Sequence, residues 1–253
     1  MDLELSGKRA LVTGASKGIG LATARVLATE GCDVHLVARS APDLEAAVAE
    51  ISASSTGRLT YSALDLSDSR NIARLCEEIS GLDILINNAG AIPAGTLESV
   101  DEDTWRDAWD LKVFGYINLC RQVYADMRGR SGVIINIIGV GGERVSAGYL
   151  AGAGGNAALM AVTRALGSIS TRDGIRVVGI NPGLIETERL VTMQRTHAAR
   201  ELGDAERWRE MLDPNFPPGR PEHIADMVAF LASPRSANTS GTVITIDGGL
   251  SAR

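Results

Sequence analysis

The chain has only three cysteines among its 253 residues, and their arrangement excludes two common uses of the thiol. Cys32, Cys76 and Cys120 are odd in number and widely spaced, without the paired spacing of a zinc site or of a redox motif. The three histidines are equally scattered and show no spacing typical of metal ligands. We therefore expect buried, reduced thiols and no metal site.

Long apolar runs are also missing. No segment approaches the roughly 20 consecutive apolar residues that a membrane-spanning helix needs. The first residues, MDLELSGKRA, are acidic and lead directly into a predicted strand, without the basic and apolar regions of a signal peptide. These absences favour a cytoplasmic protein that does not enter a membrane.

The chain has fewer basic than acidic residues. Twenty-five lysines and arginines stand against 31 aspartates and glutamates, which gives a formal net charge of -6, and both signs are spread along the chain. Nucleic acids and anionic lipids attract basic patches, and the sequence offers none. A small molecule is therefore the expected partner.

Short apolar runs alternate with longer amphipathic segments. The predicted strands cover residues 9–14, 33–39, 59–65, 83–88, 132–138, 175–181 and 242–247. The segments between them carry apolar residues at three- and four-residue spacing, as helices do. Strands that are apolar on both faces and alternate with helices form parallel sheets covered on each side. We predict one α/β domain over residues 1–253, with a doubly wound parallel sheet of about seven strands.

One long irregular segment, residues 184–220, interrupts this alternation. It is charged, contains two possible helical turns and includes the breaker run PNFPPGRP. We interpret it as a substrate lid inserted into the domain. Its cations either meet an anionic substrate or keep the lid solvated: Arg195, His197, Arg200, Arg207 and Arg209.

A glycine-rich turn follows the first predicted strand. It reads TGASKGIG over residues 13–20, and Gly14, Gly18 and Gly20 permit a tight turn and close backbone approach. The next helix would then present its free N–H groups to a pyrophosphate. Alone, such a pattern can be a tight turn and nothing more, but its place between a strand and a helix favours a dinucleotide site.

The end of the second predicted strand indicates which dinucleotide binds. An acidic residue there would bond a free ribose 2′-hydroxyl, whereas this chain has Ala38 and then Arg39. Lys17 in the glycine turn is a second cation. The two charges suit a 2′-phosphate and predict NADP(H) rather than NAD(H), although ordinary surface cations would give the same pattern.

Together with further motifs, these features resemble the short-chain dehydrogenase/reductase family over nearly the whole chain. The motifs are TGASKGIG, Asp65-Leu66, NNAG at 87–90, NPG at 181–183 followed by Thr187, GRPE at 219–222 and DGG at 247–249. The resemblance implies a Rossmann-type fold, a nicotinamide cofactor and an oxidoreductase activity.

The resemblance also assigns cofactor contacts. Asp65 and Leu66 would hold the adenine; Asn88, Ala89 and Gly90 would line the ribose; Ile185 and Thr187 would touch the nicotinamide amide and the phosphates. The complete predicted set is Gly14, Ser16, Lys17, Gly18, Ile19, Gly20, Arg39, Asp65, Leu66, Asn88, Ala89, Gly90, Pro182, Gly183, Ile185 and Thr187.

The catalytic positions depart from the family. Members usually carry an Asn-Ser-Tyr-Lys tetrad, in which Tyr protonates the substrate oxygen and Lys, four residues later, lowers the Tyr pKa. Aligned with the family, this chain has Lys112, Gly139, Gly152 and Asn156 at the four positions. Moving Tyr149 into register would place Ala153 where Lys is expected, so a simple shift does not restore the pair.

Three side chains are candidates for a replacement. We predict that Tyr149 donates the proton, that Lys112 lowers its pKa, and that Asn156 hydrogen-bonds a ribose. The plainer alternatives are a core or interface tyrosine and a salt-bridged or surface lysine.

Three glycines in one helical turn, Gly152, Gly154 and Gly155, cost a helix about 1 kcal/mol each relative to alanine. They either give room for substrate or allow close packing across a subunit interface. The apolar helix after Asn156 and the last strand are the surfaces through which relatives pair, which predicts a homotetramer or at least a dimer.

Three functions fit these residues. The first is an NADP(H)-dependent oxidoreductase acting on a small carbonyl or alcohol with a relocated proton donor. The second is a nucleotide-binding regulatory protein with little catalysis. The third is a lyase or hydrolase built on the same fold, because a fold alone does not fix a function.

Overall fold

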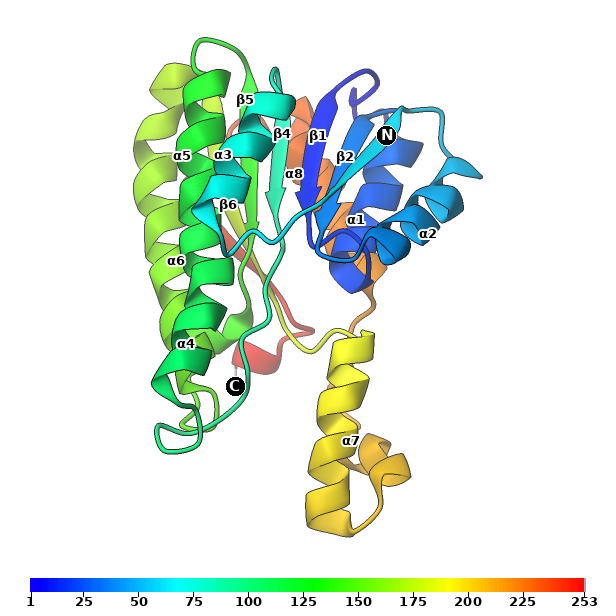
Figure 1. Ribbon diagram of the computed structural model, residues 1–253, viewed down its shortest axis with the longest axis vertical. Coiled ribbons are helices and arrows are strands. Elements are labelled where there is room, and N and C mark those ends of the chain that lie inside the picture. Colours follow the sequence, from blue (N-terminus) through cyan, green and yellow to red (C-terminus); the bar gives the residue numbers. More distant parts are fainter. Residues whose placement is uncertain (253) are drawn as a thin grey trace.

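The computed structural model describes residues 1–252 and contains one seven-stranded sheet in the order β3-β2-β1-β4-β5-β6-β7 (Figure 1). Every neighbouring pair is parallel. The strands are β1 (Arg9–Thr13), β2 (Asp33–Ala38), β3 (Leu59–Ala63), β4 (Ile84–Asn87), β5 (Gly132–Ile137), β6 (Ile175–Pro182) and β7 (Val243–Ile246). All seven predicted strands and the doubly wound α/β fold are therefore confirmed.

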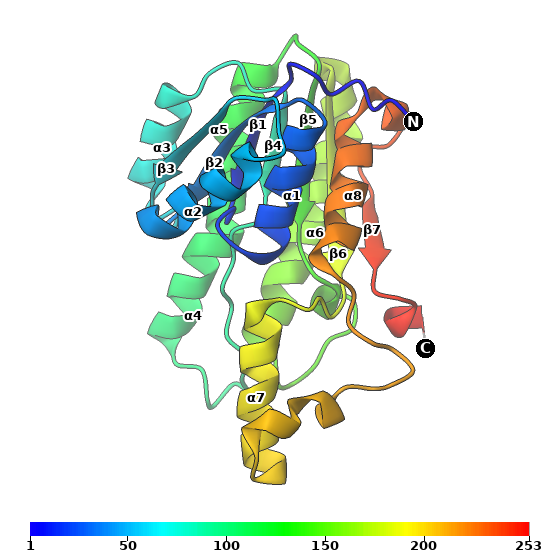
Figure 2. The same cartoon turned by 90° about the vertical axis from the view of Figure 1, so that its right-hand side faces the viewer.

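Helices cover both faces of the sheet, as Figures 1 and 2 show. They are α1 (Gly18–Thr29), α2 (Ala41–Ser52), α3 (Ser69–Glu78), α4 (Glu102–Trp109), α5 (Gly115–Met127), α6 (Leu150–Ser170), α7 (Glu188–Leu202) and α8 (Pro221–Ala232). No helix among residues 1–252 is long and apolar enough to cross a membrane.

The side chains of each strand alternate between the two faces of the sheet and so belong to two separate clusters of the core. Successive side chains of a strand point to opposite faces. Val12 of β1 accordingly packs in the cluster that includes α1, α2 and α8, whereas Leu11 packs in the cluster that includes α3 and α5. Both side chains are fully buried. Burial on both faces explains why the strands read as continuous apolar runs.

The chain changes direction across the sheet between β1 and β4. In open parallel sheets, ligands bind at the carboxyl ends of the strands beside such a switch point. The loops after β1, β4, β5 and β6 meet at this edge, and they carry most of the residues predicted from the sequence. The fold therefore gathers the candidate site there.

The insertion differs in detail from its prediction. The first of the two expected helical turns is α7, a helix of 15 residues, and a 3-10 helix follows at Ala205–Met211. Thr187 caps the start of α7 by accepting a hydrogen bond from the Leu190 N–H, and Gly203 ends it at φ 71°. Figures 1 and 2 show α7 projecting beyond the carboxyl edge of the sheet. These caps, rather than a long apolar stripe, set its length.

A π-helical turn at Asp110–Phe114 joins α4 to α5. Such a turn widens the helix by one residue and occurs often at functional sites. It presents Lys112 and Val113 to the interior.

Candidate active site

The glycine turn after β1 forms a backbone cradle. A Cβ atom on Gly20 would lie 2.1 Å from the Gly14 carbonyl oxygen, and one on Gly14 would lie 2.9 Å from the Cα of Ala89. Gly14 and Gly18 both adopt positive φ angles, 64° and 57°. Side chains are thus excluded where a pyrophosphate would approach the start of α1, which fits the predicted dinucleotide.

Two neighbours close this cradle. Asn88 donates side-chain hydrogen bonds to the main-chain oxygens of Thr13 (3.0 Å) and Gly14 (3.2 Å), and so ties the loop after β4 to the turn. A Cβ atom on Gly18 would lie 3.1 Å from the Thr187 methyl group, so the loop after β6 flanks the same turn. Asn88 and Thr187 are both among the residues that the sequence predicts to contact the cofactor.

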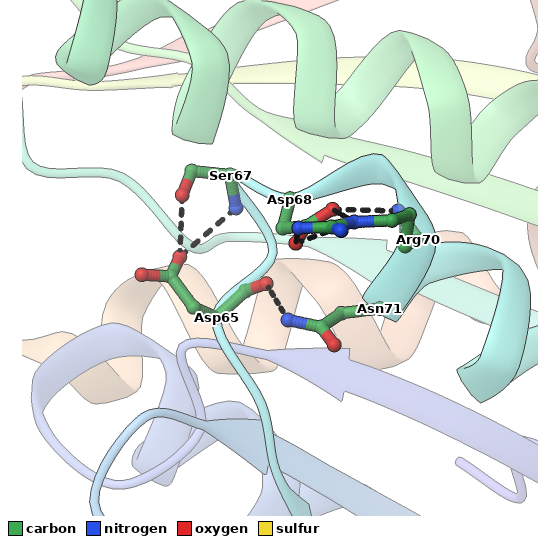
Figure 3. A network of polar contacts seen from close by, with 5 residues as sticks. All are labelled: Asp65, Ser67, Asp68, Arg70 and Asn71. Carbon is green, nitrogen blue, oxygen red and sulfur yellow. Dashed lines mark hydrogen bonds and ion pairs between the residues drawn. The ribbon is translucent and has the colours of Figure 1, made fainter.

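The adenine side of the predicted site follows β3 (Figure 3). The Asp65 carboxylate accepts hydrogen bonds from the Ser67 N–H at 3.0 Å and from its hydroxyl at 2.8 Å. The Asn71 amide donates to the main-chain oxygen of Asp65 at 2.9 Å. Leu66 is buried. These contacts fix the conformation of the Asp65-Leu66 pair.

The remaining predicted cofactor residues lie on the same edge. Ser16 stands in the glycine turn and Ile19 in the first turn of α1. Pro182 ends β6, and the Gly183 N–H donates to the Ile246 oxygen at 2.9 Å. Ile185 pairs with Gly219 in an isolated bridge that joins the two ends of the insertion.

The two cations predicted for the 2′-phosphate have different surroundings. Lys17 pairs with Asp43 and with Glu188, each at 3.5 Å, and these carboxylates raise its pKa. Arg39 is exposed and has no ion-pair partner within residues 1–252. Arg39 is therefore the cation that can meet a phosphate without giving up a carboxylate.

Lys112 is a buried cation. Its side chain is 9% exposed, packs against Gly90, and donates a hydrogen bond from Nζ to the Ile138 oxygen at 2.5 Å. Burial, with a smaller contribution from Arg189, lowers the pKa of Lys112 to about 7. An amine of this kind changes charge near neutral pH.

This pKa makes a prediction for stability. Because the unfolded chain keeps an ordinary lysine pKa of about 10.4, it binds more protons than the folded chain above pH 7. The contribution of Lys112 to the free energy of unfolding should therefore be flat below pH 7 and rise between about pH 7 and 10.

Urea unfolding at pH 6 and pH 9 checks this expectation. From pH 6 to pH 9, Lys112 should raise the free energy of unfolding of the wild-type protein by on the order of 2 kcal/mol. The Lys112→Met variant should lack this rise. Lys8→Met, which alters a partly exposed lysine paired with Asp83, serves as control. An identical pH dependence in wild type and Lys112→Met would contradict the assignment.

Asn156 lies beside the loop that follows β5. Its side chain is 2% exposed, and its Oδ1 atom has no hydrogen-bond partner in the described chain. A Cβ atom on Gly139 would lie 3.1 Å from the Asn156 Nδ2. A buried acceptor without a donor is costly, and a ribose hydroxyl would satisfy it. The orphaned oxygen therefore fits the predicted ribose contact.

The Tyr149 ring occupies the space that a side chain at position 152 would need. A Cβ atom on Gly152 would lie 1.9 Å from the ring Cζ, and one on Gly141 would lie 3.1 Å from the ring. The room predicted for substrate at Gly152 is thus filled by Tyr149 itself. The glycine lets the ring fold back onto the first turn of α6.

The cation that acts on Tyr149 is Arg189. Burial raises the pKa of the Tyr149 phenol, and interaction with the Arg189 guanidinium opposes this effect. Lys112 is not among the groups that shift the Tyr149 pKa, and its amine donates to the Ile138 oxygen instead. The prediction that Lys112 lowers the Tyr149 pKa is therefore corrected.

Sequence reasoning missed Arg189. It is the second residue of α7, and Nη1 donates to the Gly90 oxygen at 3.0 Å while Nη2 donates to the Ile92 oxygen. The only available signal was its place two residues after Thr187. That position says nothing of where a long side chain reaches.

Gly155 serves packing within the chain. A Cβ atom on Gly155 would lie 3.1 Å from Val113 and 3.4 Å from Ile92, so this glycine lets α6 approach the π-helical turn closely. Gly154 is exposed, and a Cβ atom there would make an ordinary contact with Trp109 at 3.4 Å. Packing within the described residues thus explains Gly155 but not Gly154.

The chain is similar to known proteins over most of its length. A family model described as short chain dehydrogenase matches residues 8–198. The chain is 34% identical to the 2-keto-3-deoxy-L-fuconate dehydrogenase of Xanthomonas campestris, over 99% of this chain and 82% of that protein. It is 32% identical to the 3-oxoacyl-(acyl-carrier-protein) reductase of Vibrio cholerae, over 98% and 99% of the two chains.

Solved structures of similar proteins share the fold of this chain. The L-sorbose reductase of Gluconobacter frateurii, in complex with NADPH and L-sorbose, superposes with a TM-score of 0.92 at 30% identity, and the match covers 100% of both chains. The actinorhodin polyketide ketoreductase with NADPH superposes with a TM-score of 0.90 at 27% identity over 98% of each chain.

Proposed function

Since this chain belongs to the short-chain dehydrogenase/reductase family, we propose that it is an NADP(H)-dependent oxidoreductase that reduces a small carbonyl compound, with Tyr149 as the proton donor. The observation that carries the proposal is the Tyr149 ring in the space next to Gly152, the position that aligns with the family's catalytic tyrosine. The usual tetrad is then replaced at all four positions, by Lys112, Gly139, Gly152 and Asn156.

Two features support a nicotinamide cofactor, namely the glycine turn after β1 and the Asn156 Oδ1 atom without a hydrogen-bond partner in the described chain. Gly14, Gly18 and Gly20 leave the backbone bare at the start of α1, and Asn156 offers Oδ1 to a ribose hydroxyl. When bound, NADPH supplies the hydride that adds to the substrate carbonyl carbon. Related structures contain NADPH, which is consistent with this choice.

NADPH should bind more than tenfold more tightly than NADH. The reason is the unpaired Arg39, because a charge-assisted contact with the 2′-phosphate is worth roughly 1.5–3 kcal/mol. Fluorescence titration of the two nucleotides measures the preference. Arg39→Leu should remove most of it and leave NADH affinity unchanged.

Lys17→Leu is the matched comparison for this titration. Its effect should be smaller, because the Lys17 ammonium already pairs with Asp43 and Glu188. Equal curves for NADPH and NADH with the wild-type protein would defeat the assignment.

Tyr149 performs the acid step. As the carbonyl carbon accepts hydride, its oxygen gains negative charge, and the phenol donates a proton to that oxygen. A phenol whose pKa is raised by burial stays protonated at neutral pH. It is thus in the protonated form that the reduction of a carbonyl requires.

Relatives do not fix the substrate. Their names mention a 3-oxoacyl group on a carrier protein, 2-keto-3-deoxy-L-fuconate and L-sorbose, which share a ketone group and little else. We propose a small carbonyl substrate that enters beneath α7, with the insertion 184–220 acting as a lid. We also propose a homo-oligomer, a tetramer or else a dimer, paired through α6 and β7.

A nicotinamide absorbance screen over ketones, aldehydes and alcohols tests the function. NADPH should be consumed with at least one carbonyl compound, with one alcohol formed per NADPH oxidised. Tight nucleotide binding without turnover would instead indicate a binding protein. Substrate conversion without an absorbance change would indicate a lyase or hydrolase.

A further inference from the structure

Arg189 links the base of the insertion to the catalytic edge. Its guanidinium donates hydrogen bonds to the oxygens of Gly90 and Ile92, on the loop that follows β4. Gly90 also packs against the Lys112 side chain. The arginine therefore sits where the loop after β4, the π-helical turn and the start of α7 come together.

The neighbourhood of Arg189 is cationic and lacks a balancing carboxylate. Arg189 acts electrostatically on both Lys112 and Tyr149, and no acidic group in the described chain contributes to the pKa of either. The nearest acidic residue along α7, Glu188, pairs with Lys17 instead. An anion bound here would relieve the repulsion between Lys112 and Arg189.

Arg189 also differs from three other arginines of the insertion. Arg195, Arg200 and Arg207 pair with the carboxylates of Glu206, Glu201 and Glu210, respectively. Arg189 contacts two main-chain oxygens and the Tyr149 phenol, all of them uncharged, which position its side chain without neutralising its charge. The two main-chain hydrogen bonds use two of the five N–H donors of a guanidinium.

We propose that Arg189 binds a carboxylate of the substrate, so that the preferred substrates are 2-oxo or 3-oxo acids rather than neutral ketones. This inference rests on the proposed carbonyl reduction. Because Arg189 and the Tyr149 phenol are neighbours, the carboxylate and the reacting carbonyl must lie within a few bonds of each other.

The reaction balances with the carboxylate unchanged. The carbonyl carbon would gain the hydride that bound NADPH supplies, the carbonyl oxygen would gain the Tyr149 proton, and Tyr149 would then regain a proton from water, so that a hydroxy acid and NADP⁺ form. The planar guanidinium suits the two oxygens of a carboxylate, and it orients the carbonyl toward the phenol.

Matched acid and ester pairs test the proposal. The probes are pyruvate, acetoacetate and benzoylformate, each compared with its methyl ester, in NADPH-dependent turnover. A charge-assisted hydrogen bond worth roughly 1.5–3 kcal/mol predicts at least a tenfold higher kcat/KM for the acid in one or more pairs. Arg189→Gln should bring that ratio close to one. Arg195→Gln, on the same helix, is the control and should keep the wild-type ratio.

A binding experiment separates this proposal from the proposed function. Oxamate, a 2-oxo acid analogue that cannot be reduced at its amide under these conditions, is titrated into the NADPH complex by calorimetry. Oxamate binding that is lost in Arg189→Gln, while NADPH affinity and melting temperature stay close to wild type, supports the carboxylate site even if no carbonyl compound is turned over. Arg189→Lys should retain part of the binding.

Two results would overturn the inference. One is the absence in the wild-type protein of both an acid preference and oxamate binding. The other is an acid preference or oxamate binding that Arg189→Gln leaves unchanged. Turnover of esters and acids at equal rates, together with no binding of oxamate, would reject the carboxylate site while leaving the reductase assignment intact.

Discussion

Tyr149→Phe should lower NADPH-dependent turnover by on the order of 10²-fold or more and leave nucleotide affinity nearly unchanged. The substitution removes one oxygen from a ring whose packing against Gly152 and Gly141 is otherwise retained. The lower rate would therefore reflect the loss of the proton donor rather than a change in the shape of the pocket. Steady-state kinetics and NADPH titration measure the two quantities separately.

Tyr124→Phe is the matched control for this variant. The Tyr124 phenol donates to the Asp173 carboxylate at 2.7 Å, and both residues lie on the opposite end of the sheet from the candidate site. Its turnover should match the wild type. An unaltered rate in Tyr149→Phe would remove Tyr149 from the mechanism and favour the nucleotide-binding protein.

Gly152→Ala should inactivate the enzyme about as strongly as the loss of the phenol. The new Cβ atom would lie 1.9 Å from the Tyr149 Cζ, so the ring must leave its place. Alanine would ordinarily stabilise a helix interior by about 1 kcal/mol relative to glycine. Here the displaced ring offsets that gain, and we expect lower stability together with an activity loss on the order of 10²-fold.

Two companion variants show whether the clash is the cause. Gly154→Ala adds a Cβ atom 3.4 Å from Trp109, an ordinary contact, so it should keep activity and gain stability. Adding Tyr149→Ala to Gly152→Ala should recover the helix-propensity gain without recovering turnover. A fully active Gly152→Ala would contradict the placement of the ring.

The fold was predictable because its signals are local. Each strand is a short apolar run bounded by polar or glycine residues, and burial on both faces of a parallel sheet makes such runs continuous. The glycine turn was predictable for a similar reason: Gly14 and Gly18 adopt conformations that other residues avoid. The cofactor half of the site follows from these two signals.

The catalytic half depends on contacts between distant segments. The Lys112 amine binds the main-chain oxygen of Ile138, 26 residues away, and no side-chain pattern marks a main-chain acceptor. Arg189 reaches oxygens nearly a hundred residues earlier in the chain. The partner assigned to Tyr149 was wrong because a flexible side chain's reach cannot be judged from spacing alone.

The length of α7 was underestimated for a different reason. Few of its residues are buried, with Leu190 and Ala198 the examples, so the apolar periodicity that marks a helix is weak. The Thr187 cap and the Gly203 terminator define it instead. Where a helix projects from a domain, its capping residues indicate its ends as well as apolar periodicity does.

The identity of the proton donor is tested most directly by single-turnover oxidation of bound NADPH at saturating carbonyl substrate, followed in water and in deuterium oxide across a range of pH. If Tyr149 is the donor, transfer should be slower in deuterium oxide and the rate should not change as pH rises through neutrality, because burial keeps the phenol protonated. A rate that falls as pH rises through about 7, the pKa of Lys112, would contradict the account and make Lys112 the acid.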